Sequence, residues 1–123
     1  AKEVNVRWDY NRMNDVIINL IINAIDAIED ENYAIISAVF SDNSYKESMI
    51  DIIVENTNSY IEEDTIKKLF TPFFTTKSHG VGIGLAVSKR IVEAHGGSIT
   101  VKSVSGNFQA TAFIITMPVE LNG

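Results

Sequence analysis

Two segments of helical periodicity, set among β-rich runs, constrain the fold of this chain more than any other feature. Residues 11–29 repeat apolar side chains at helical spacing, which predicts one amphipathic helix. The side chains of this helix that can face a core are Val16, Ile17, Leu20, Ala24, Ala27 and Ile28. A second long helix is predicted over residues 82–94, and it ends at His95-Gly96-Gly97, where glycine suits the position after the last turn.

The β-rich runs predict strands over residues 4–8, 33–40, 49–55, 98–104 and 108–117. The last two runs flank Ser105-Gly106-Asn107, which is typical of a hairpin turn. A short helix over residues 61–69 is followed by a loop that continues to Gly80. Long helices combined with a strand-rich second half predict an α/β fold, a two-layer sandwich with helices on one face of a mixed sheet.

Composition and charge exclude several classes of protein. The 123 residues suffice for one domain with its own core, and they contain no cysteine, which excludes disulfides and thiolate metal sites. No apolar run reaches the roughly 20 residues that a membrane-spanning helix needs. The net charge of −6 argues against binding to a nucleic-acid backbone. An acidic protein that binds a polyphosphate must place its few cations locally or use a metal ion.

A glycine-rich turn is the first candidate for chemistry. Gly80-Val81-Gly82-Ile83-Gly84-Leu85 has glycine at alternate positions and leads into the second long helix. Glycine lets the backbone pass close to a phosphate, and the helix start adds free N–H groups and a favourable dipole. The same pattern also occurs in turns that only pack a helix against a strand, so these six residues leave both interpretations open.

Asp15, Asn19 and Asn23 form a polar stripe on the first helix, because they are spaced four residues apart. Asparagine is a mediocre helix former, so its recurrence in register with an aspartate favours coordination. Carboxylate and amide oxygens suit Mg²⁺ that is also bound by phosphate oxygens and water. A solvated helix face is the alternative that the spacing leaves open.

Four segments together resemble the catalytic ATP-binding domain of sensor histidine kinases, in order and spacing over nearly the whole chain. Two segments resemble the N box of this family: Asp9-Tyr10-Asn11-Arg12-Met13-Asn14-Asp15 and Asn19-Leu20-Ile21-Ile22-Asn23-Ala24. The F box is similar to Leu69-Phe70-Thr71-Pro72-Phe73-Phe74-Thr75-Thr76-Lys77, and the second glycine box is similar to residues 80–85. The helix and turn that follow in the family resemble Ser88-Lys89-Arg90-Ile91-Val92-Glu93-Ala94-His95-Gly96-Gly97. The resemblance implies the Bergerat fold of the gyrase and MutL ATPases, whose mixed, mostly antiparallel sheet is covered on one face by about three helices.

The resemblance also implies a role for individual residues. Asn23 would hold a Mg²⁺ ion that bridges the ATP phosphates, with Asn19 and Asp15 supporting it, and Lys77 would reach the terminal phosphates. Asn19 and Lys77 are therefore the expected catalytic residues. Residues 61–80 would form the ATP lid. The expected nucleotide-binding set is Asp15, Asn19, Asn23, Asn56, Ile61, Phe70, Lys77, Gly80, Val81, Gly82, Ile83, Gly84 and Leu85.

The segment before the lid departs from the family pattern Asp-x-Gly-x-Gly. Counting back from Ile61 places Asn56 at the aspartate and Asn58 and Tyr60 at the two glycines. A neutral asparagine can still accept a hydrogen bond from the adenine amino group, at a cost of about 1–2 kcal/mol relative to a carboxylate. Tyr60 is the larger departure, because a ring replaces bare backbone. A register that uses Glu55 instead of Asn56 also remains open.

The resemblance implies a protein-histidine kinase that positions Mg-ATP for transfer of the γ-phosphoryl group to a histidine. That histidine would lie on a separate dimerisation domain, which is not visible in residues 1–123, and a response regulator would receive the phosphoryl group next. The domain would be cytoplasmic and monomeric in isolation, within a homodimeric parent that can be membrane-anchored. No contact with nucleic acid or with the membrane is expected. The alternative function is a degenerate, kinase-like signalling scaffold with weak or no nucleotide binding, which the altered residues 56–60 motivate.

Overall fold

The computed structural model describes residues 4–5, 7–26, 28, 34–41, 48–57, 59–71, 84–106 and 109–121. Its elements in chain order are β1 (Val4–Asn5), α1 (Tyr10–Asp26), β2 (Ala34–Ser41), β3 (Ser48–Thr57), α2 (Glu63–Lys68), α3 (Leu85–Ala94), β4 (Ser98–Val104) and β5 (Ala110–Leu121). Every element that the sequence predicts is present in this order. The largest difference is at the end of β5, which continues four residues further than predicted. β1 and α1 each end three residues earlier than predicted, and α3 begins three residues later.

The strands form one sheet in which β5 is the central element. One edge of β5 pairs with β3, which in turn pairs with the edge strand β2. Thr116 pairs with both Asp51 of β3 and Ser98 of β4, so β4 lies along the opposite edge of β5. The last two residues of β5 pair with β1. All of these pairings are antiparallel in the described residues, so the sheet has no parallel pair there.

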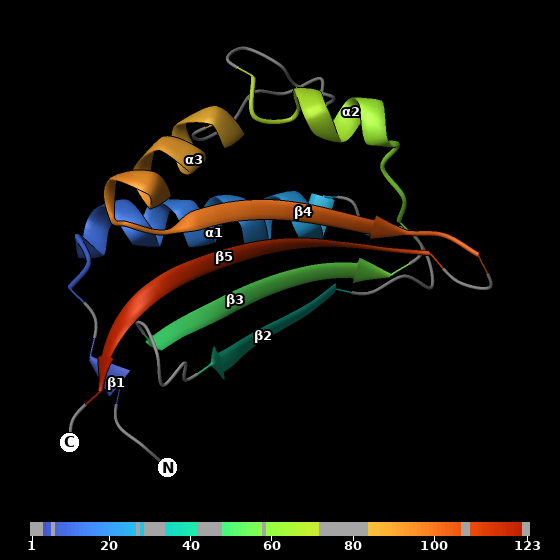
Figure 1. The fold of residues 1–123 in the computed structure, drawn as a ribbon. Coiled ribbons are helices and arrows are strands. Elements are labelled where there is room, and N and C mark those ends of the chain that lie inside the picture. Colours follow the sequence, from blue (N-terminus) through green and yellow to red (C-terminus); the bar gives the residue numbers. More distant parts are fainter. Residues whose placement is uncertain are drawn as a thin grey trace.

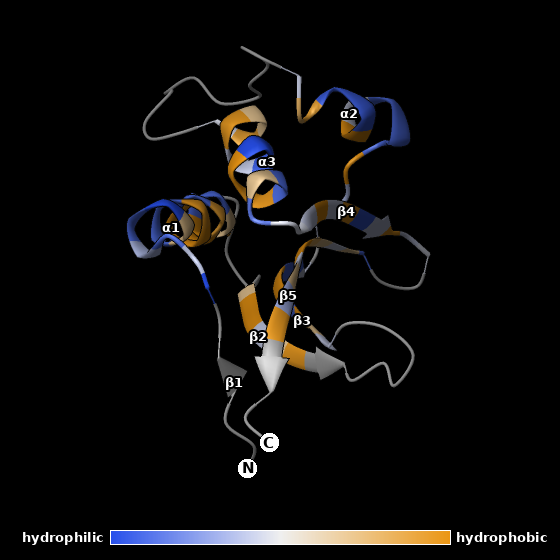
Figure 2. Cartoon of the chain, turned by 60° about the vertical axis from the view of Figure 1, so that its left-hand side comes forward, coloured by the Kyte–Doolittle hydropathy of each residue, from blue (hydrophilic) through white to orange (hydrophobic). Residues whose placement is uncertain are grey.

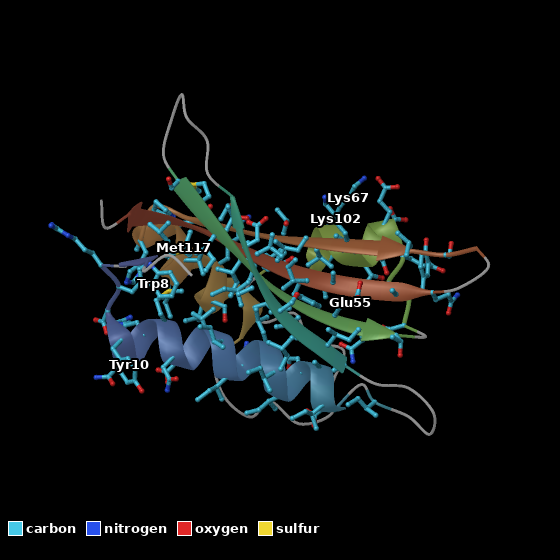
Figure 3. All side chains as sticks on the ribbon, turned by 90° about the horizontal axis from the view of Figure 1, so that it is seen from below. Trp8, Tyr10, Glu55, Lys67, Lys102 and Met117 are labelled. Carbon is cyan, nitrogen blue, oxygen red and sulfur yellow. The ribbon has the colours of Figure 1, made fainter. Side chains whose placement is uncertain are left out.

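Three helices lie on one side of this sheet (Figure 1), which confirms the two-layer α/β sandwich. Coloured by hydropathy, α1 and α3 turn their apolar sides toward the strands (Figure 2). The buried core is built from both layers and comprises Met13, Val16, Leu20, Ala24, Val54, Ile91, Val92, Ile99, Ile115 and Met117. Trp8 packs against this cluster, beside Met117 in Figure 3, whereas Tyr10 points outward.

The periodicity of α1 identified its buried face correctly in the main. Val16, Leu20 and Ala24 are buried, and Ile17 packs against them from the side. The prediction was wrong for Ile28, which is 39% exposed, because α1 ends at Asp26 and the residue lies beyond its last turn. Ala27 lies outside the described residues.

The end of α3 is fixed by a glycine turn. The N–H of Gly96 donates to the carbonyl of Glu93, and that of Gly97 donates to the carbonyl of Val92, each at 3.0 Å. These two bonds define a Schellman motif, and the φ of Gly96 is +81°, a conformation that glycine adopts without strain. The motif turns the chain from α3 directly into β4.

Among the described residues, no helix is long and apolar enough to cross a membrane.

Candidate functional site

A buried polar bond joins α1 to α3. The side-chain amide of Asn19 donates to the hydroxyl of Ser88 across 3.3 Å, and Asn19 and Ser88 are 7% and 0% exposed. At the other end of the same helix pair, the backbone N–H of Asp9 donates to Nε2 of His95 across 3.0 Å. The start of α1 thus meets the end of α3, and the two helices run in opposite senses along their contact.

This antiparallel contact brings two predicted motifs to the same end of the helix pair. Asn23 lies one turn after Asn19 in α1, and Gly84 lies one turn before Ser88 at the start of α3. Each is therefore displaced by about 6 Å along its own helix from the Asn19–Ser88 bond, in the direction away from His95. Asn23 is half-buried, and the first N–H groups of α3 lie toward the same end of the helix pair, so the phosphate interpretation of the glycine turn stays a prediction.

A second buried bond ties the end of β3 to α1 beside Asn23. The side-chain Nδ2 of Asn56 donates to the carbonyl oxygen of Ala24 across 2.8 Å. Asn56 is 7% exposed, and Ala24 directly follows Asn23 in α1. The residue at the family's aspartate position therefore lies next to the residue predicted to hold the metal.

The segment after β3 is held by hydroxyl groups of the sheet. Thr111 donates its hydroxyl to the carbonyl of Ser59 across 2.9 Å, and Ser103 accepts the N–H of Ile61 across 2.9 Å. The two hydroxyl oxygens are 2.6 Å apart. Because the Thr111 proton points to Ser59, Ser103 must donate to Thr111, which gives a directed chain of three bonds that we call the hydroxyl relay. The relay fixes the backbone on both sides of Tyr60, whose side chain is 45% exposed.

The predicted F-box residue Phe70 contacts α3. Its half-buried ring packs against the hydrophobic core, and the ammonium of Lys89 lies 5.4 Å from the ring centroid. This distance is within the range of a cation–π interaction. Phe70 thereby connects the end of α2 with the helix that follows the glycine turn.

The remaining predicted site residues divide into two groups. Asp15 is exposed on α1, one turn before Asn19, so the stripe runs from solvent into the α1–α3 interface. A uniformly solvated face, the alternative for this stripe, is excluded by the burial of Asn19. Leu85 begins α3 and packs against the core. Lys77, Gly80, Val81, Gly82 and Ile83 lie outside the described residues, so their roles stay predictions.

The chemistry of the described side chains suits a metal that is bound mainly by ligand and water. No group of three or more histidine, cysteine or acidic side chains that could hold an ion is found in the described ranges. Mg²⁺ commonly keeps several waters and uses only one or two protein oxygens together with phosphates. The carboxamide of Asn23 fits that requirement.

Sequence reasoning did not identify the groups that hold these motifs together. Ser88, Ser103 and Thr111 are small hydroxyl residues, and the carbonyl of Ala24 belongs to the backbone. For Ser88 a signal was available, because it lies three and four residues before the buried Ile91 and Val92 and so shares their helix face. The sequence contains no comparable signal for the backbone carbonyl.

Comparison with known proteins gives a match over nearly the whole chain. Residues 8–121 match the family described as histidine kinase-, DNA gyrase B- and HSP90-like ATPases. The sensor histidine kinase ZraS of Salmonella typhi is 39% identical over 117 residues, which is 93% of this chain and 23% of that protein. The chain thus spans about a quarter of the length of this curated relative.

Solved structures share the fold. The nucleotide-free catalytic domain of the histidine kinase ThkA is 34% identical, with a TM-score of 0.72 over 92% of this chain and 70% of that chain. ThkA in complex with the response regulator protein TrrA is 32% identical, with a TM-score of 0.67 over 92% of this chain and 30% of that one.

Proposed function

Because the chain belongs to the family of histidine kinase-, DNA gyrase B- and HSP90-like ATPases, we propose that it is the catalytic ATP-binding domain of a sensor histidine kinase. The single observation that carries the proposal is the convergence of three motifs. Asn23 of α1, Asn56 of β3 and the start of α3 are distant in sequence but are connected by the Asn19–Ser88 and Asn56–Ala24 bonds.

The proposed site works by positioning. Asn23 would hold Mg²⁺. The N–H groups at Gly84 and Leu85 would donate hydrogen bonds to phosphate oxygens at the positive end of α3. Asn56 would accept a hydrogen bond from the adenine amino group. Phosphoryl transfer needs alignment and charge neutralisation more than covalent chemistry from the protein, so amides and backbone N–H groups are an adequate set. Lys77 would add the positive charge that an acidic domain otherwise lacks.

We further propose that residues 61–80 form the ATP lid and that the γ-phosphoryl group passes to a histidine on a separate dimerisation domain. A response regulator would then accept it, a partner supported by the ThkA complex with TrrA. As expected for this family, the domain would be cytoplasmic. Phosphorylation of a histidine-containing dimerisation domain by this chain with radiolabelled ATP tests the transfer, and an unlabelled domain would contradict it.

Calorimetric titration with ATP and Mg²⁺ tests the nucleotide site. We expect saturable binding by the wild type, and its loss in Asn23→Ala because the substitution removes the carboxamide that would hold Mg²⁺. Asn14→Ala is the matched control, since Asn14 is an exposed asparagine on the same helix, and we expect this variant to keep the wild-type affinity. Equal affinity of Asn23→Ala and the wild type would contradict the metal role. Absence of any binding up to millimolar ATP would contradict the proposed function and leave the scaffold alternative standing.

A further inference from the structure

Exposed apolar side chains gather on two neighbouring elements of the domain. Eleven large hydrophobic side chains are exposed among the described residues, and most of them belong to α1, to the residue after it, or to β2. These seven are Ile18, Ile22, Ile25, Ile28, Ile35, Ile36 and Val39, and we call the surface that they form the α1–β2 edge. Single exposed apolar residues are ordinary, but a concentration of this kind marks an interaction surface.

The two halves of the α1–β2 edge border each other. The Asn56 side chain bonds the carbonyl of Ala24, and Asn56 pairs with Ala34 in the sheet, so the end of α1 lies beside the start of β2. Ile25 directly follows Ala24 in α1. Ile36 lies two residues after Ala34, on the same face of β2. The exposed side of α1 and the helix-facing side of β2 are therefore neighbours.

The helix layer stops before it covers β2. Ile36 and Val54 are directly opposite each other in the β2–β3 pair, so their side chains lie on the same face of the sheet. Val54 is 1% exposed, whereas Ile36 is 53% exposed. The face that forms the core at β3 is thus left open at β2. On α1, the exposed isoleucines follow one another at spacings of four and three residues and share one side of the helix.

The free edge of β2 decides what kind of partner fits. β2 is the outermost strand on its side of the sheet (Figure 1), and in the described part of the chain it pairs only with β3. The N–H and C=O groups along its other side match another extended strand. β2 contains no charged residue and no proline, the usual protection of an edge, whereas β4 on the other side of the sheet carries Lys102.

β2 is complementary to a second copy of itself. Two antiparallel β2 strands can be related by a two-fold axis that passes through Ser37. In this register Ile36 faces Ala38 of the second copy, and Ile35 faces Val39 of the second copy. Each exposed apolar side chain of β2 then meets an apolar one, and the helix-facing sides of both strands lie on the same face. We infer that the α1–β2 edge is the interface through which two copies of this chain pair, with β2 of one copy continuing the sheet of the other.

A second copy fits both halves of this surface. It brings its own α1, whose isoleucines would cover those of the first copy, while a single extended peptide would leave this side of α1 exposed. A chain with a net charge of −6 repels its own copy overall, but no charged side chain of β2 opposes another across the pair. The resulting dimer differs from the monomer that the family resemblance implies for the isolated domain.

Pairing at this edge leaves the proposed nucleotide site free. Successive residues are about 100° apart around an α-helix, so the Asn23 side chain lies at least about 100° from the exposed isoleucines of α1. The inference goes beyond the proposed function, and its test needs no nucleotide.

Sedimentation of the chain at increasing concentration tests the pairing. We expect the average mass to rise from that of one chain toward that of two between about 10 µM and 1 mM, as for a small interface. Ile36→Lys and Ile25→Lys each place an ammonium group in the interface and should raise the midpoint at least about tenfold. Val104→Lys is the matched control, since Val104 is an exposed residue of β4, and this variant should pair like the wild type.

A disulfide tests the register of the two strands. Because the chain contains no cysteine, Ser37→Cys introduces one thiol per copy. Residues that face each other across an antiparallel pair have Cα atoms about 4.5–5.5 Å apart, which allows a disulfide. Val39→Cys is the control, because in this register residue 39 lies about 14 Å from its counterpart in the second copy. Oxidation should link Ser37→Cys and leave Val39→Cys unlinked.

Three results overturn the inference. The first is a mass of one chain at the highest of these concentrations. The second is a dimer that persists unchanged in both lysine variants of the α1–β2 edge, and the third is loss of pairing in Val104→Lys, which would place the interface at β4. If Ile36→Lys does not fold, the cysteine variants decide, and a disulfide in Val39→Cys but not in Ser37→Cys contradicts the pairing. ATP binding by the monomeric variants should equal that of the wild type, so failure of this inference leaves the proposed function standing.

Discussion

The carboxamide of Asn19 and the hydroxyl of Ser88 form a buried hydrogen bond of 3.3 Å between α1 and α3. The bond lies one turn from Asn23 in one helix and one turn from Gly84 in the other. It therefore sets the spacing between two groups that we propose to bind the same nucleotide, and Asn19 would contribute to function by holding α3 in register with α1.

Removing this bond should lower stability measurably. Asn19→Ala is expected to reduce the free energy of unfolding by about 1–2 kcal/mol, because it leaves the buried Ser88 hydroxyl without this partner. A double-mutant cycle with Ser88→Ala, followed by urea denaturation, should give a coupling energy of about 0.5–1.5 kcal/mol. Additive effects of the two substitutions would show that the bond contributes nothing.

Gly97→Ala should be strongly destabilising. A Cβ at this position would lie 2.4 Å from the Met117 sulfur and 2.5 Å from the Thr116 carbonyl oxygen. Because one of these atoms belongs to the backbone, the strand after the turn must shift, at a cost of about 1–3 kcal/mol or more. Gly84→Ala is the matched control, since a Cβ there meets nothing within 4 Å, and we expect a loss of at most about 1 kcal/mol. Equal midpoints of chemical denaturation for the two variants would contradict this packing.

His95→Phe should remove the hydrogen bonds through which His95 joins the start of α1 to the end of α3. The imidazole lies between the Ile91 carbonyl, 2.7 Å from Nδ1, and the Asp9 N–H, 3.0 Å from Nε2, so the neutral ring carries its proton on Nδ1. Phenylalanine keeps the ring volume and removes both bonds, with an expected loss of about 1–2 kcal/mol in the free energy of unfolding.

The control for this prediction is Asp9→Asn. Asparagine keeps the backbone N–H and the side-chain oxygen that caps α1 by accepting from the Arg12 N–H, so stability should change by no more than about 0.5 kcal/mol. If His95→Phe unfolds at the same denaturant concentration as the wild type, the two bonds do not couple the helices.

Thr111→Val should release the segment that leads into α2. Valine is close to threonine in shape, but it leaves the Ser59 carbonyl without its donor and breaks the hydroxyl relay. We expect a loss of about 1–3 kcal/mol, since Thr111 is only 2% exposed.

Hydrogen exchange at the amide of Ile61 provides a local readout of the same change. This amide donates to Ser103, the other member of the relay, so Thr111→Val should accelerate its exchange more than that of amides inside β5. Thr100→Val, on the exposed side of β4, is the control and should leave exchange at Ile61 unchanged. Unaltered exchange in Thr111→Val would exclude a role for the relay in holding this segment.

Residues 56–60, which depart from the family pattern, are held in the fold by contacts that the family resemblance did not predict. From the family pattern we expected Asn56 to be a weaker hydrogen-bond acceptor than aspartate, and the Tyr60 ring to stand where the family has only backbone. In the fold, Asn56 makes a bond to Ala24 that a carboxylate could not donate, and the hydroxyl relay holds the backbone around Tyr60 without glycine. These residues form a coherent local arrangement.

The sequence by itself determined the order and type of the elements, because hydrophobic periodicity and turn residues act over a few neighbouring positions. The strand Ser98–Val104 was predicted to the residue, and the core face of α1 was correct within the helix. It also determined the family, since the motifs recur in a fixed order.

Only the tertiary structure decided how the motifs meet. Asn19 and Ser88 are 69 residues apart, and Asn56 bonds a carbonyl 32 residues earlier in the chain. Pairings of this kind depend on the crossing of two helices and the register of a sheet. Their energies become available only when distant segments are packed and water is excluded, so no local pattern of side chains encodes them.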